Sequence, residues 1–127
     1  MAPISVTLAR RDPPAAVVAL VGEHDAYSAP RLENELAVLL DANRRVVVDL
    51  RDASFIDSTT LSVLLAARRR AEESSLGFAL VLDDRDYTQV HQILELTGLG
   101  RSFAVCGELE DALAAVRAGR VTAARAA

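Results

Sequence analysis

The chain has 127 residues, a formal net charge of −4 and an apolar fraction of 51%. This length suits one domain with a substantial core, and the apolar fraction excludes an intrinsically disordered chain. The mild acidity argues against broad nucleic-acid binding, which needs a basic face. The single cysteine, Cys106, excludes an intrachain disulfide and a CxxC metal site.

The sequence shows no membrane or export signal. No apolar run reaches the roughly 18 residues that a membrane span requires. The first residues lack a cationic start, and Arg10, Arg11 and Asp12 interrupt the apolar stretch that a secretory signal needs. We therefore expect a cytoplasmic protein that contacts neither a membrane nor nucleic acid directly.

The N-terminal residues predict a β-hairpin. Residues 5–9 alternate polar and apolar side chains, which is typical of a half-buried strand. Asp12-Pro13-Pro14 predicts a turn, because proline has no backbone donor for a strand ladder. Ala15–Val21 then supplies the second strand of the hairpin.

A helix and a buried strand follow the hairpin. Ser28 is suited to capping a helix, and Pro30 is tolerated in the first helical turn. Leucines at positions 32, 36, 39 and 40 lie on one face of that helix. Arg45–Leu50 contains three consecutive valines, a run typical of a strand that is covered on both faces.

The second half of the chain alternates predicted helices and strands. We expect helices over 59–74, 86–97 and 109–116, and strands over 77–82 and 103–106. Gln89 stands three residues after Asp86, as in a helix capping box. The order β-β-α-β-α-β-α-β-α predicts an α/β fold, in which a mixed sheet carries about four helices. We expect one domain over residues 1–119 and a disordered tail over 120–127.

The segment between the valine strand and the next helix carries the most information. The strand ends at Leu50, Phe55-Ile56-Asp57-Ser58 follows as a loop, and a helix opens at Ser58. The Ser58 hydroxyl is suited to accept hydrogen bonds from the free amides of the first helical turn. Helix capping alone is therefore enough to explain why Asp57 and Ser58 stand at the start of this helix.

Four short motifs stand in order along the chain. They are Gly22-Glu23-His24-Asp25, Ser28-Ala29-Pro30-Arg31-Leu32, Val47-Val48-Asp49-Leu50 followed by Phe55-Ile56-Asp57-Ser58, and Leu94-Glu95-Leu96-Thr97-Gly98-Leu99. In order and spacing they resemble the STAS domain family, and in particular the bacterial anti-sigma factor antagonists. The resemblance extends from about Ser5 to Arg117. It implies a STAS-like fold, in which an N-terminal hairpin joins parallel strands in one mixed sheet.

The same resemblance implies a function for Ser58. In these antagonists the serine directly after the loop aspartate is phosphorylated by a partner anti-sigma factor that is itself a serine kinase. Unphosphorylated protein sequesters this kinase, and a phosphatase restores the unphosphorylated form. Thr59 and Thr60 are rival phosphoacceptors, and Thr60 replaces a glycine of the family pattern. The expected partner-binding residues are Asp25, Asp57, Ser58, Thr59 and Thr60.

Other functions remain open at this point. A STAS-like subunit without a phospho-switch would contact its partner permanently, in a multi-protein stress-signalling or lipid-transport complex, and the glycine replacement by Thr60 favours it. A receptor for a nucleotide or other small molecule has no GxGxxG or Walker motif in its favour. No metal-ligand spacing joins His24 or His91 to carboxylates, so we expect no metal and no cofactor. Ser58 lies in no GxSxG elbow, so we do not expect an enzyme.

Overall fold

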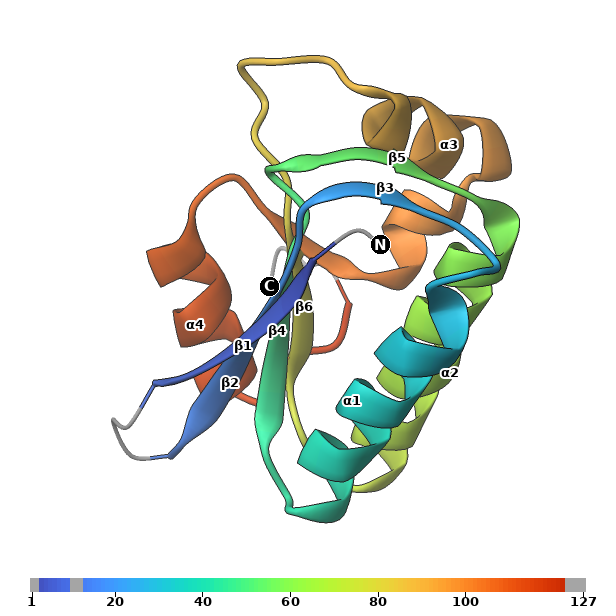
Figure 1. Cartoon of the computed structure of the whole chain (residues 1–127). Coiled ribbons are helices and arrows are strands. Elements are labelled where there is room, and N and C mark those ends of the chain that lie inside the picture. The colour runs from blue at the N-terminus through green and yellow to red at the C-terminus, as the bar shows by residue number, and fades with distance from the viewer. Residues whose placement is uncertain (1–2, 10–12, 123–127) are drawn as a thin grey trace.

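Within residues 3–9 and 13–122, which the computed structural model describes, a five-stranded sheet forms the centre of the fold (Figure 1). In spatial order, its strands are β1 (Ile4–Ala9), β2 (Ala15–Leu20), β4 (Arg45–Asp49), β6 (Phe78–Val81) and β7 (Ala104–Cys106). β1 and β2 pair antiparallel, and the other neighbours in this sheet pair parallel. The predicted mixed sheet, with an N-terminal hairpin joined to parallel strands, is therefore confirmed.

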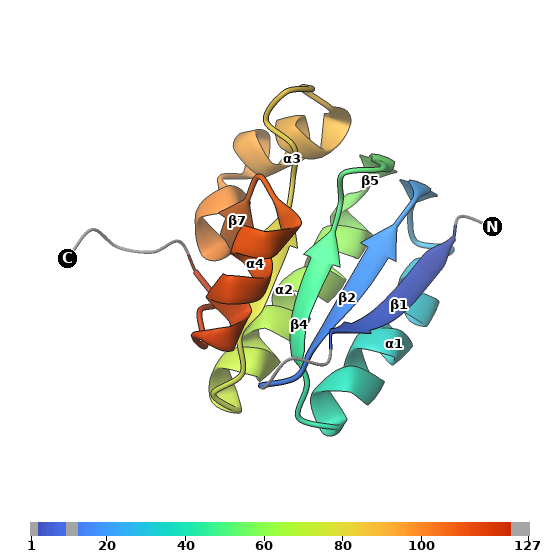
Figure 2. The ribbon, with the colours of Figure 1, turned by 90° about the vertical axis from the view of Figure 1, so that its left-hand side faces the viewer.

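Four α-helices in the described part of the chain surround this sheet, as predicted. They are α1 (Ala29–Asp41), α2 (Ser58–Glu73), α3 (Gln89–Thr97) and α4 (Leu109–Arg117), and a short 3-10 helix, η1 (Leu99–Ser102), follows α3. Figures 1 and 2 show that α1 and α2 cover one face of the sheet and α4 covers the other. The sheet is therefore the middle layer of three.

The valine run of β4 shows how the two faces of the sheet are used. Val46 and Val48 belong to the apolar core beneath α1 and α2, whereas Val47 belongs to the smaller cluster beneath α4. All three side chains are fully buried, because alternate residues of a strand point to opposite faces. The leucines of α1 that predicted an apolar face, at positions 32, 36, 39 and 40, are buried as well.

A two-stranded parallel sheet, which the sequence pattern does not predict, lies at one end of the molecule. It consists of β3 (Gly22–His24) and β5 (Ala53–Ile56). The prediction that residues 55 and 56 belong to a loop is wrong. Both strands are too short to show a recognisable apolar pattern. Gly22, at φ +79°, turns the chain out of β2, a conformation that glycine adopts without steric cost.

Helix α3 begins at Gln89 rather than at the predicted Asp86. Thr88 precedes the first turn, and its backbone N–H donates to Nδ1 of His91 at 3.0 Å. The Gln89 side chain bonds instead to the backbone N–H and the carbonyl of Ile56, each at 2.9 Å. The predicted capping box of Asp86 and Gln89 is therefore wrong, because Gln89 joins α3 to β5.

Residues 120 and 121 are bonded to the sheet. The carbonyl of Arg120 accepts the backbone N–H of Phe78 at 2.9 Å, and the carbonyl of Val121 accepts that of Ala104 at 3.1 Å. Val121 is also buried. The folded domain thus reaches at least residue 121, and residues 123–127 of the expected tail lie outside the described residues.

Gly77 precedes β6 and lies against the end of α4, where a Cβ atom would overlap the backbone of Val116. We expect Gly77→Ala to lower the free energy of unfolding by about 1–3 kcal/mol, because packed backbone does not move aside as a flexible side chain does. Urea denaturation followed by circular dichroism measures this change. Gly100→Ala is the control, since its Cβ would meet only the Leu94 side chain, at 3.8 Å. Equal losses in the two variants would contradict this account.

Candidate functional site

The N-termini of α1 and α2 lie next to each other where the two-stranded sheet ends (Figure 1). β3 leads into α1, and β5 leads into α2. The last residues of these strands, His24 and Ile56, are partners in the parallel register. Asp25 and Asp57 therefore leave the sheet side by side, although they are far apart in the sequence.

Asp57 caps helix α2. Its Oδ1 accepts the backbone N–H of Thr60 at 2.8 Å, and its own backbone is extended. Its Oδ2 accepts the backbone N–H of Ala26, in the β3–α1 loop, at 3.0 Å. The prediction that the Ser58 hydroxyl caps this helix is wrong. The carboxylate of Asp57 is a charged acceptor and suits the positive end of the helix dipole.

Ser58 is the first residue of α2, and its side chain is exposed. The structure shows no hydrogen bond from its hydroxyl to any described residue. Thr59 is exposed too. Thr60, in contrast, is fully buried, and its Oγ1 has no hydrogen-bond partner in the described part of the chain. Thr60, which is expected among the partner-binding residues and rival phosphoacceptors, is therefore inaccessible at the surface, whereas Ser58 and Thr59 are accessible.

His24 and Ser28 lie beneath the β3–α1 loop. His24 is the last residue of β3, and its side chain is fully buried. Its Nδ1 lies 3.1 Å from Oγ of Ser28. Ser28 occupies the predicted cap position of α1, yet its hydroxyl makes no bond to the amides of that helix. It contacts His24 and the backbone N–H of Asp25 instead.

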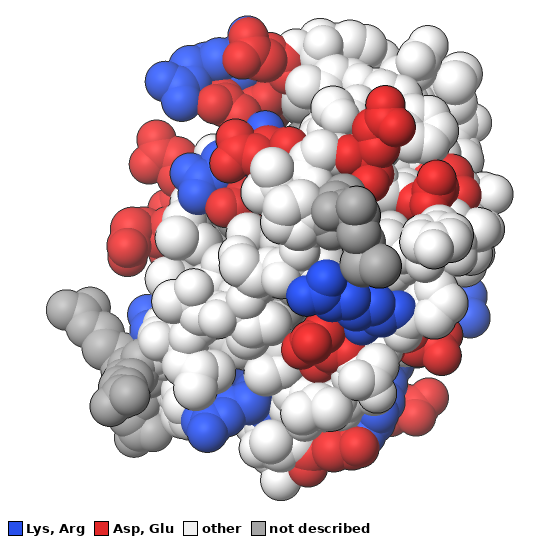
Figure 3. Space-filling view, viewed as in Figure 1, with Lys and Arg blue, Asp and Glu red and all other residues white. Residues whose placement is uncertain are grey.

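Asp25 and Glu23 add exposed negative charge near Asp57. Oδ1 of Asp25 accepts the backbone N–H of Tyr27 at 2.9 Å, which keeps this carboxylate within the loop. Figure 3 shows acidic side chains apart from arginines on the upper right of this face, the region of β3, β5 and α3 in Figure 1. The candidate site is thus acidic before any modification.

Two exposed aromatic side chains flank these residues, and the sequence analysis missed both. Tyr27 is 80% exposed and Phe55 is 38% exposed. Tyr27 also lines an open cleft of about 470 Å³, together with Pro3, Val21, Gly22, Glu23, Asp25 and Ser28. Exposed aromatic residues are enriched where proteins bind one another. The available signal was an aromatic residue just before a helix start, outside the apolar stripe of that helix.

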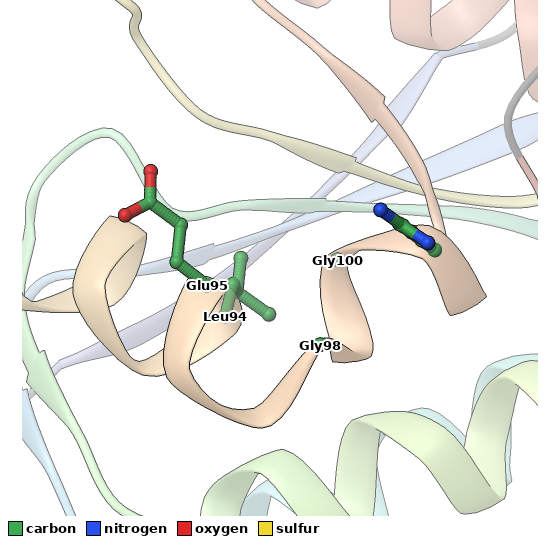
Figure 4. A pocket seen from close by; sticks show the side chains of 5 residues that line it. Leu94, Glu95, Gly98 and Gly100 are labelled. Atoms are coloured by element: carbon green, nitrogen blue, oxygen red, sulfur yellow. The ribbon is translucent and has the colours of Figure 1, made fainter.

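A second hollow, at the C-terminal end of α3, has fewer polar side chains than the candidate site. It has a volume of about 390 Å³ and is lined by Leu94, Glu95, Gly98, Gly100 and Arg101 (Figure 4). Gly98 ends α3 in the left-handed conformation, at φ +70°, directly after the predicted helix end at residue 97. Glu95 and Arg101 are the only charged residues of this lining, and together they match no known arrangement of catalytic residues.

A polar cleft lies between the β4–β5 turn and the β6–α3 loop. Near it, Asp49 forms an ion pair with Arg51, and Asp83 forms one with Arg85. Hydrogen bonds from Arg85 lower the pKa of Asp83 to about 2. Burial raises the pKa of the Asp49 carboxyl, but hydrogen bonds from Arg51 outweigh burial and keep this pKa below its ordinary value. Among the described residues, no group of three or more His, Cys, Asp or Glu side chains could hold a metal ion.

The helices of the described part are all too short or too polar to span a membrane. A family model described as the Mlab, STAS domain matches residues 7–113 of the chain. The anti-sigma-F factor antagonist RsfB of Mycobacterium tuberculosis is 31% identical over 122 residues, which cover 94% of this chain and 97% of that protein.

Solved structures agree with these sequence matches. The crystal structure of an anti-sigma factor antagonist from Mycobacterium paratuberculosis has a TM-score of 0.74 and 30% identity, covering 91% of this chain and 95% of that one. Unphosphorylated SpoIIAA, an anti-sigma factor antagonist, has a TM-score of 0.64 over 88% of this chain and 94% of its own; at 15% identity it supports the fold alone. The chain therefore belongs to the STAS domain family and, within it, to the bacterial anti-sigma factor antagonists.

Proposed function

We propose that this antagonist is switched by phosphorylation of Ser58. The unphosphorylated protein binds and sequesters, in the cytoplasm, an anti-sigma factor that has serine kinase activity. Phosphorylation by that partner releases it, and a phosphatase restores the binding form. The observation that carries this proposal is the exposed Ser58 hydroxyl, which is free of hydrogen bonds to described residues and stands directly after the Asp57 cap.

The position of Ser58 suits a phosphoryl group. It is the first residue of a helix of 16 residues, so the free amides and the positive end of the helix dipole favour an anion there. A phosphate adds a charge of about −1.5 to −2 at pH 7. This charge would stand beside Asp57 and near Asp25, in surroundings that are already acidic.

The switch requires no change of fold. A partner surface that fits the unmodified site would meet a bulky, charged group on an acidic background, so the complex would dissociate by local repulsion and loss of fit. Asp57 uses its carboxylate oxygens to bond Thr60 and Ala26, so the backbone around Ser58 is already held. The two states of the protein would therefore differ in surface charge more than in structure.

Burial of Thr60 weakens the case for a non-switching subunit. That alternative rested on a β-branched residue crowding the partner at this position. The Thr60 side chain lies in the interior instead. Thr59 is exposed, so the choice of phosphoacceptor lies between Ser58 and Thr59.

Phosphate mapping separates these two residues. We expect the wild type and Thr59→Ala to gain one phosphate on incubation with ATP and the kinase-type anti-sigma factor of the same organism, and Ser58→Ala to gain none. Intact-mass spectrometry followed by peptide mapping measures this. A phosphate on Ser58→Ala would assign the switch to another residue. A stable complex without any phosphate would favour the non-switching subunit.

Binding affinity tests the effect of charge at the same position. We expect Ser58→Glu to weaken binding to the anti-sigma factor at least about tenfold, because it places a carboxylate in the interface. Ser58→Ala should bind as the wild type does. Calorimetry in the presence of ADP, which prevents phosphate transfer, gives the dissociation constants.

The matched control for this measurement is Ser74→Glu, which adds the same charge at the C-terminal end of α2, where Ser74 is exposed. We expect it to leave the dissociation constant within about twofold of the wild type, because exposed charges that are far apart are screened. Equal weakening by both substitutions would mean that net charge, and not the position of Ser58, controls binding.

A further inference from the structure

A buried histidine lies directly beneath the candidate site. The exposed fraction of His24 is 0%. Its Nε2 lies 3.1 Å from the carbonyl oxygen of Val21. Because a carbonyl only accepts hydrogen bonds, Nε2 carries a hydrogen, and in the neutral ring Nδ1 is then an acceptor for the Ser28 hydroxyl. The carbonyl oxygen of Asp25, at 3.4 Å, is a second and more distant acceptor for the same hydroxyl. Both ring nitrogens are therefore hydrogen-bonded, and these two bonds fix the tautomer of the neutral ring.

These two bonds hold both ends of the β3–α1 loop. Val21 precedes β3, and Ser28 precedes the first residue of α1. Oγ of Ser28 also accepts the backbone N–H of Asp25 at 3.3 Å. The imidazole thus ties together the two ends of the segment that carries Ala26 and Tyr27.

The loop held by His24 in turn holds the residue before the phosphoacceptor. The backbone N–H of Ala26 donates to Oδ2 of Asp57 at 3.0 Å. The carbonyl of His24 accepts the backbone N–H of Asp57 at 3.2 Å. Asp57 therefore donates one backbone bond to His24 and accepts a second bond, on its side chain, from the loop that the histidine ring orders.

We propose that His24 is a positioning residue for Ser58. Its ring fixes the β3–α1 loop, the loop amide fixes Asp57, and Asp57 sets the start of α2 at which the partner docks. The inference rests on the proposed function of Ser58. An apolar side chain would fill the same interior space without the desolvation cost of an imidazole. The contribution that only the histidine makes is its pair of hydrogen bonds across the loop.

Phosphorylation kinetics test the proposal. We expect His24→Leu to raise the KM of the partner kinase for this protein about tenfold, with kcat within about twofold of wild type, because a loosened loop must be ordered on docking. His24→Gln, whose amide supplies one donor and one acceptor, should recover most of the KM. A wild-type KM for His24→Leu would overturn the proposal.

The control is the other histidine. His91 bonds Thr88 at the start of α3, and among the described residues it makes no hydrogen bond to the β3–α1 loop or to Asp57. His91→Leu removes a comparable bond at a helix start, and we expect its KM to match the wild type. An equal rise in KM for His24→Leu and His91→Leu would also overturn the proposal, since it would reflect general destabilisation.

A second readout needs no partner and therefore separates this inference from the proposed function. In His24→Leu, hydrogen exchange at the Ala26 amide should accelerate at least about tenfold, while the amides of β4 follow only the global stability. Ser28→Ala, which removes the hydroxyl that bonds Nδ1, should also accelerate exchange at the Ala26 amide. It replaces His24→Leu in this test if His24→Leu does not fold. Unchanged Ala26 exchange would overturn the inference. Accelerated exchange in a protein that no kinase modifies would defeat the proposed function alone.

Discussion

The carboxylate of Asp57 is the interaction on which the candidate site depends. One oxygen accepts a backbone amide of α2, and the other accepts a backbone amide of the β3–α1 loop. These segments are distant in the sequence and are brought together by the short parallel pair β3 and β5. A charged acceptor serves both, and hydrogen bonds to charged groups are among the stronger ones in proteins. With the cap supplied by Asp57, the Ser58 hydroxyl is left facing solvent.

This division of roles would let a small domain carry the proposed phosphorylation switch without refolding. The sheet, with helices on both faces, supports the site, and the Ser58 hydroxyl lies outside the apolar core. Asp57 and the buried His24 hold the backbone on either side of the site. A phosphoryl group on Ser58 would then change charge and shape at one point, and the partner would sense the difference. Tyr27 closely follows Asp25 and Phe55 closely precedes Asp57 in the sequence, so both exposed rings flank the candidate site.

The sequence predicts those parts of the fold that depend on local pattern. The valine run of β4, the leucine face of α1 and the glycine that ends α3 are all recognisable, because burial on a strand or helix leaves a period in the residues. β3 and β5 leave none, since each strand is too short to show an alternating pattern. The wrong cap predicted for α3 has a related cause, because the Gln89 side chain bonds to Ile56, far along the chain. At the start of α2 the sequence offers two adjacent capping residues, Asp57 and Ser58, and the local pattern does not choose between them. The burial of Thr60 and the bonds of His24 likewise depend on tertiary neighbours.

The most direct test of the central claim compares amide chemical shifts of the unphosphorylated and the phosphorylated protein by NMR. If phosphorylation acts through local charge on a fixed backbone, the large changes will be confined to the β3–α1 loop and the first turn of α2. The amides of β4 and β6, in the middle of the sheet, will keep their shifts. Large changes throughout the sheet would show that the protein refolds when it is modified, and would contradict the account.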